Sequence, residues 1–173
     1  MKSAHDLEFF EREIDSFLPD RIYDAHTHIW KPEFYSFSDQ SVDWTDYQSA
    51  MTSLHGQRPT YAMFIPFVGK DSLAYQLEAN EWAARQKDAH PYNRCNFFVK
   101  PDDDSDWILE HATRLGATGL KCYHNMAKTS PTWEADIQAF LPEHQVRLCH
   151  EQSWFITLHI VKKNALANDA NIE

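Results

Sequence analysis

The amino-acid sequence predicts an α/β fold with about five parallel strands and helices between them. Short apolar runs of strand length recur along the chain, and segments with apolar residues at helical spacing separate them. Parallel neighbours need a long crossover connection, which a helix supplies, so this alternation is typical of βα units. The predicted strands are residues 22–30, 61–67, 95–99, 119–124 and 154–161.

Polar residues and prolines mark the expected helix boundaries. The expected N-caps are Asp6 for a helix ending near Ser16, Asp71 or Ser72 after the second strand, and Asp103 or Ser105 after the third. The N-terminal helix falls within residues 1–18. Residues 31–59 are expected to form a long loop with a short helix near 44–54, and such loops often cover a functional site. Another helix is expected over 142–152, and residues 162–173 form a polar tail.

Length and composition fit one soluble domain. The chain has 173 residues, 43% of them hydrophobic, and a net charge of -10 without a cluster of basic residues. A nucleic-acid or anionic-membrane surface is therefore not expected. No apolar run approaches the ~18–20 residues needed to cross a bilayer, and no signal peptide is recognised. The three scattered cysteines (Cys95, Cys122 and Cys149) are expected to be buried thiols of a cytoplasmic protein.

Two histidines close the first predicted strand. His26 and His28 are two residues apart, so in an extended chain both side chains point to the same face. Two imidazoles on a rigid strand can occupy adjacent positions around one divalent metal ion. A pair of surface histidines is the alternative reading.

Two further strand ends carry candidate ligands. Lys121 lies in the fourth predicted strand and His159 in the fifth. Parallel strands end at the same side of a sheet or barrel, so these residues can converge with the histidine pair. A buried lysine must find a partner or lose its charge. The alternatives are a hydrogen-bonded core histidine at 159 and a lysine that reaches solvent or a carboxylate at the end of the sheet.

Several neighbours are candidates for contact with a substrate or with a ligand. Tyr123 and His124 lie just beyond Lys121, and Trp30 opens an aromatic stretch that is placed to cover a small organic acid, lactone or ester. Aromatic loop residues also pack without any such role, and His124 can be a surface residue. Asp24 is a candidate second-layer carboxylate that orients an imidazole.

Three motifs together resemble one protein family. They are Tyr-Asp-Ala-His-Thr-His-Ile-Trp, Gly-Leu-Lys-Cys-Tyr and Ile-Thr-Leu-His-Ile, in that order. This pattern resembles the amidohydrolase superfamily, in its amidohydrolase-related metal-dependent branch. The resemblance implies a (β/α)8 TIM-type barrel in which His26, His28 and His159 are metal ligands. It also implies that Lys121 is the strand-four lysine, which is often carboxylated, ligates the metal in some branches of the family and is absent in others, so Lys121 is a fourth candidate metal ligand. Imidazole ligands favour zinc, with manganese, iron or cobalt also open.

The chain departs from the family pattern in its C-terminal half. A full barrel needs ~250 residues, and nothing matches the strand-six histidine or the strand-eight aspartate. In the family that aspartate takes the proton from metal-bound water. We therefore expect residues 1–173 to form one incomplete barrel domain without strands six to eight. An open sheet exposes an edge, so the chain is expected to form homo-oligomers, to recruit a missing C-terminal half, or to aggregate.

The function implied by the resemblance is hydrolysis of a small organic acid, lactone, ester or amide by metal-activated water. No residue matches the catalytic aspartate, so metal binding with low or absent activity is expected. Other readings stay open. One is a non-catalytic remnant or partner-binding fragment, and another is a metal-dependent phosphoesterase or a related decarboxylase. The strand-four lysine points to the hydrolytic members more than to the decarboxylases.

Overall fold

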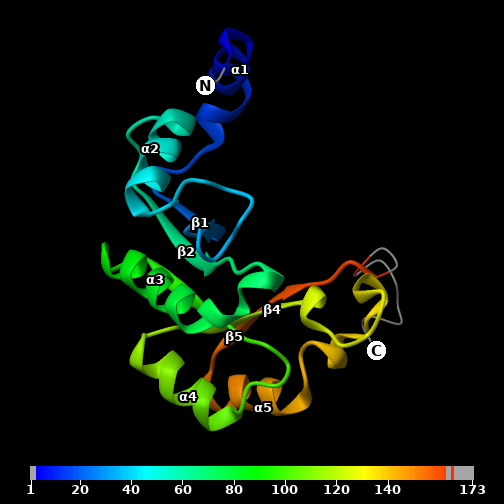
Figure 1. Cartoon of the computed structure of the whole chain (residues 1–173). Helices are drawn as coiled ribbons and strands as arrows, with labels where there is room; N and C mark the ends of the chain where they lie inside the picture. The colour runs from blue at the N-terminus through cyan, green and yellow to red at the C-terminus, as the bar shows by residue number, and fades with distance from the viewer. Residues whose placement is uncertain (1–2, 163–164, 166–173) are drawn as a thin grey trace.

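Five parallel strands form one sheet in the order β1-β2-β3-β4-β5. The structure is a computed structural model that describes residues 3–162 and 165. The strands are β1 (Ile22–Ile29), β2 (Thr60–Pro66), β3 (Arg94–Phe98), β4 (Gly119–Tyr123) and β5 (Phe155–His159). Figure 1 shows the sheet curled into a half-barrel with helices outside it. The predicted α/β class and its five parallel strands are confirmed.

One helix precedes the first strand, and one longer helix lies in each connection between consecutive strands. They are α1 (Ala4–Phe9), α2 (Trp44–His55), α3 (Gln76–Asp88), α4 (Ser105–Arg114) and α5 (Glu143–Gln152). Shorter turns add a π-helix at Phe10–Ile14 and 3-10 turns at Asp15–Phe17, Lys70–Tyr75, His124–Met126, Thr132–Glu134 and Ile137–Ala139. The helix predicted near 44–54 is therefore confirmed. Most of the predicted tail at 162–173 lies outside the described residues.

The predicted N-caps of the first and fourth helices are wrong by a few residues. Ser3 caps α1, and Asp6 is the N3 residue of the same capping box, where its carboxylate accepts the Ser3 backbone N–H at 2.8 Å. Asp104 caps α4 by accepting from the backbone N–H groups of Asp106 and Trp107. In each case several polar residues stand close together, and only the backbone conformation selects the one that caps.

The predicted cap of the helix after β2 is also wrong. Ser72 has φ −115° and ψ 19°, which interrupts the helical path, so Lys70–Tyr75 forms a separate turn. α3 then begins at Gln76 without a side-chain cap. Asp103, one of the two residues predicted to cap α4, closes the turn after β3 instead, because its carboxylate accepts the Lys100 backbone N–H at 2.7 Å.

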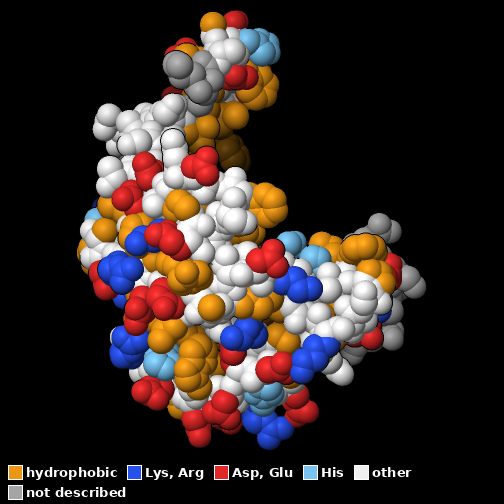
Figure 2. Space-filling model, in the orientation of Figure 1, with side chains coloured by type: hydrophobic (Ala, Val, Ile, Leu, Met, Phe, Trp, Pro, Cys, Tyr) orange, Lys and Arg blue, Asp and Glu red, His pale blue; other side chains and the backbone are white. Residues whose placement is uncertain are grey.

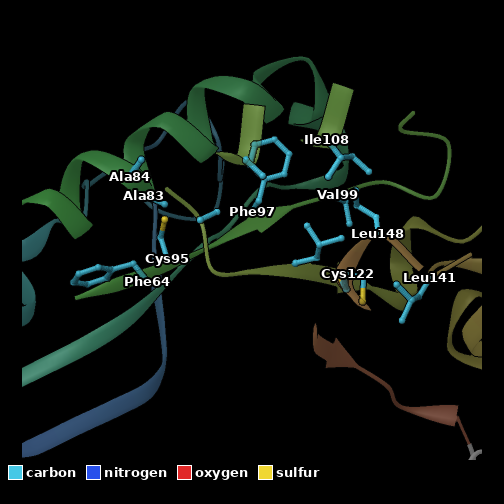
Figure 3. Packing of buried hydrophobic residues seen from close by; sticks show 14 of the residues in the cluster. Phe64, Ala83, Ala84, Cys95, Phe97, Val99, Ile108, Cys122, Leu141 and Leu148 are labelled. Atoms are coloured by element: carbon cyan, nitrogen blue, oxygen red, sulfur yellow. The ribbon is translucent and has the colours of Figure 1, made fainter. Parts of the chain in front are cut away.

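The main hydrophobic core lies between the sheet and helices α3, α4 and α5. Figure 3 shows Phe64, Cys95 and Phe97 of the strands against Ala83 and Ala84 of α3, with Ile108 of α4 nearby. Leu120 and Cys122 of β4 join the same cluster. The three cysteines are buried and free, as predicted.

The alternation of side chains sends a second set of strand residues to the opposite, concave face. Leu120 and Cys122 both face the helices, so Lys121 between them points to the concave side. Phe98 and Thr157 are its register partners on the neighbouring strands and share that face. The concave face therefore carries Lys121, one of the predicted site residues.

Gly119 permits the close approach of β4 to β5. A Cβ atom at this position would lie 2.4 Å from the carbonyl oxygen of Phe155 and 2.9 Å from its ring. Gly119→Ala is expected to lower the free energy of unfolding by about 2 kcal/mol or more, since the clash involves backbone. Chemical denaturation measures the change. Gly69→Ala is the matched control, because its Cβ would meet its nearest atom at 3.5 Å, and equal losses in both variants would contradict the prediction.

Candidate metal centre

The two histidines of β1 meet at the carboxyl end of the strand. His26 Nε2 lies 3.2 Å from His28 Nε2, and the ring centroids are 5.0 Å apart. Zinc–nitrogen bonds of ~2.0–2.1 Å at a tetrahedral angle separate two ligand nitrogens by about 3.3 Å. The pair therefore fits two positions of one divalent ion. In the metal-free protein the same distance lets one ring donate a hydrogen bond to the other.

His28 is held in an environment that keeps its ring neutral. Its ring packs edge-to-face on Phe67 with centroids 5.1 Å apart, and the Tyr123 hydroxyl lies 3.5 Å from Nδ1. Burial, followed by the charges of Lys121 and the other histidines, lowers the pKa of His28 to about 4. A neutral imidazole is the form that binds metal, so His28 is available as a ligand at neutral pH.

Lys121 is a buried cation on the concave face. It is 1% exposed, and its Nζ lies 4.7 Å from the centre of the Tyr123 ring. No carboxylate pairs with it in the part of the chain that the structure describes. Burial lowers the pKa of Lys121 to about 8. A fraction of this amine is therefore neutral near physiological pH, which makes it more nucleophilic than a surface lysine.

A second pair of histidines lies at the ends of β4 and β5. The ring centroids of His124 and His159 are 5.0 Å apart, and the Tyr123 ring lies 5.6 Å from that of His159. Burial lowers the pKa of His159, and the charges of His124, Lys121 and His26 lower it further. These groups thus share one electrostatic environment. Within residues 3–162 and 165, however, no three His, Cys, Asp or Glu side chains are close enough to hold one ion.

Two of the predicted residues, Asp24 and Trp30, form hydrogen bonds that involve no imidazole ring. The Asp24 carboxylate accepts the backbone N–H of His26 at 2.9 Å and the Thr27 hydroxyl at 2.6 Å, so it bonds the strand and not an imidazole ring. The indole N–H of Trp30 donates to the Gln40 carbonyl at 3.1 Å, which fixes the base of the loop after β1. Tyr123 and His124 lie beside the histidines, as the sequence order suggested.

Two aromatic residues beside His28 were not selected from the sequence. Phe67 contacts His28, and Tyr35 packs edge-to-face on Phe67 at 4.6 Å between centroids. The aromatic richness of residues 30–47 was the available signal, but it has no periodicity that would single out Tyr35. Figure 2 shows the molecule hollowed on one side, with histidine side chains among those at the edge of the hollow.

Comparisons with known proteins leave the chain without an assigned family. No protein-family model, curated protein or solved structure matches it. Among residues 3–162 and 165, no helix combines the length and apolar character that a bilayer crossing requires.

Proposed function

We propose that this chain carries a metal-dependent hydrolase site of the amidohydrolase-related type, on a partial (β/α)8 TIM-type barrel. The observation that carries the proposal is the 3.2 Å separation of the Nε2 atoms of His26 and His28. This separation fits two ligands of one ion, and it occurs at the carboxyl end of a parallel strand. That end of the sheet is where barrel enzymes place their active sites.

The other strand ends support the same site. Lys121 and His159 lie on β4 and β5, and Tyr123 of β4 contacts the rings of both His28 and His159. A single aromatic side chain thus links the two ends of the concave face.

The roles of the residues follow from their positions. His26 and His28 would hold the ion, zinc by preference, with manganese, iron or cobalt as alternatives. His159 is the proposed third ligand, which requires β5 and β1 to approach, because no three-ligand group is formed by the described residues. The chemistry that a divalent ion supplies at such a site is Lewis acidity, which polarises a carbonyl group and acidifies water.

Lys121 and the residues near it would bind the substrate. A buried ammonium attracts the carboxylate or carbonyl oxygen of a small organic acid, lactone, ester or amide. Tyr123 and His124 flank this position.

Since no carboxylate contacts the imidazole rings within the described residues, we propose low or absent turnover by this chain alone. Its acidic composition and buried free cysteines agree with a cytoplasmic location.

Metal analysis of the pure chain tests the proposal. After growth in zinc-supplemented medium, elemental analysis is expected to find close to one equivalent of divalent metal per chain. A panel of lactones, esters and amides, assayed with zinc, manganese and cobalt, measures the remaining turnover. A chain that stays metal-free and takes up no zinc would overturn the proposed function, whereas robust turnover would overturn only the prediction of impaired activity.

A further inference from the structure

The strand that carries the histidine pair contains a bulge. Asp24 is in register with Ala62 and Thr27 with Phe64, so β1 has one more residue than β2 between these two pairs. Ala62 and Phe64 belong to the core beneath the helices. Asp24 and Thr27 therefore both face the helices, and the extra residue lies immediately before or at His26.

The side chain of Asp24 holds this bulge from the helix side. One carboxylate oxygen accepts the His26 backbone N–H at 2.9 Å. The other accepts the Thr27 hydroxyl at 2.6 Å, and the Tyr47 hydroxyl lies 3.5 Å from the same oxygen. Because the two Asp24 oxygens accept hydrogen bonds from adjacent residues, His26 and Thr27, they fix the backbone conformation at His26. The backbone conformation in turn sets the direction of the His26 imidazole.

Tyr47 ties this arrangement to the long loop after β1. It lies on α2, is 4% exposed, and packs edge-to-face on Phe64 with centroids 5.7 Å apart. Burial, and next the charge of Asp24, raises the pKa of the Tyr47 hydroxyl, so the group remains a hydrogen-bond donor at physiological pH. Tyr47, held in place on α2, thus donates to the Asp24 carboxylate.

We infer that Asp24, supported by Thr27 and Tyr47, is a positioning residue that sets the separation of His26 and His28 and thereby the metal affinity of the site. The inference rests on the proposed function. If the Asp24 carboxylate had only a structural role, its hydrogen bonds would raise the free energy of unfolding and leave the metal affinity of the folded protein unchanged. Outer-layer partners that orient ligands typically change metal affinity by 10–100-fold.

Zinc affinity of the full-length chain, measured by competition with a chromophoric chelator, tests the inference. Asp24→Asn keeps one acceptor oxygen and cannot accept from both His26 and Thr27. We therefore expect its zinc affinity to fall by about tenfold or more, measured at temperatures where the variant is folded. Thr27→Val removes the 2.6 Å bond with little change of volume and is expected to weaken binding in the same direction. The visible spectrum of bound Co²⁺ is expected to shift in both variants, because it reports ligand geometry.

Asp43→Ala is the matched control for stability. Asp43 caps α2 through the backbone N–H groups of Thr45 and Asp46, so its loss destabilises the same helix without touching β1. Thermal unfolding in the presence of chelator compares the stabilities of all variants in their metal-free form. We expect Asp43→Ala to keep wild-type zinc affinity.

The outcomes separate this inference from the proposed function. If the wild type binds zinc and Asp24→Asn and Thr27→Val bind it equally well, the positioning role is overturned and the proposed function stands. Equal losses of affinity in Asp24→Asn and Asp43→Ala would also overturn it, since stability alone would then explain the effect. A wild-type chain without zinc affinity would overturn both.

Discussion

His28→Ala is expected to lower zinc affinity by more than about 100-fold, because the variant loses a direct metal ligand. Loss of a residue that only orients a ligand already lowers metal affinity by up to about 100-fold. His28 Nε2 forms one half of the 3.2 Å pair, and its ring is the more buried of the two. The remaining His26 offers a single imidazole, which binds zinc weakly. Chelator competition at pH 7.5 measures the change.

His150→Ala is the control for this experiment. His150 lies on the exposed side of α5, away from the concave face, so its removal is expected to leave zinc affinity unchanged. Similar affinities of His28→Ala and the wild type would show that zinc binds elsewhere, and the assignment of the metal centre would then be wrong.

Lys121→Met is expected to raise the free energy of unfolding at pH 7, by up to about 3 kcal/mol in the metal-free protein. The pKa of Lys121 falls from 10.5 to about 8 because burial penalises the charged amine. Methionine has a similar volume and carries no charge to bury. Urea denaturation in the presence of chelator measures the gain.

The gain is expected to depend on pH in a defined direction. Below pH 8 the folded and unfolded states both bind the Lys121 proton, and the burial penalty is complete. Between pH 8 and 10.5 the unfolded state binds more protons, so wild-type stability rises with pH and the advantage of methionine disappears. Lys128→Met, at an exposed ion pair with Asp102, serves as control and is expected to change stability by less than about 0.5 kcal/mol. A loss of stability in Lys121→Met at pH 7 would contradict the prediction.

The strands and their parallel arrangement were predictable because their signals are local. Apolar runs bounded by polar residues give the position of each strand, and alternation with helices gives the parallel arrangement. That arrangement places His26, Lys121 and His159 at the same end of the sheet, but it does not bring three ligand side chains of the described residues together around one ion. Helix caps were less predictable. Asp103, Asp104 and Ser105 are all suitable by residue type, and only the backbone conformation selects Asp104.

The position of Asp24 could not be derived from strand periodicity. Alternation places it on the same face as His26, two residues away, and this led to the prediction of a contact with an imidazole. The bulge in β1 breaks the alternation and turns Asp24 to the helix side. A one-residue irregularity leaves no clear mark in sequence, because it is stabilised by tertiary bonds such as that from Tyr47.

The strand order has a consequence for how the site is assembled. Neighbouring strands follow one another along the chain, so each parallel pairing joins two consecutive strands across a single connection. His26 and His159, however, occupy the first and last strands of the described sheet. The proposed site with His159 as third ligand is therefore complete only after β5 has paired with β4. Local fraying of β5 would dismantle it while the core under α3 and α4 stays folded.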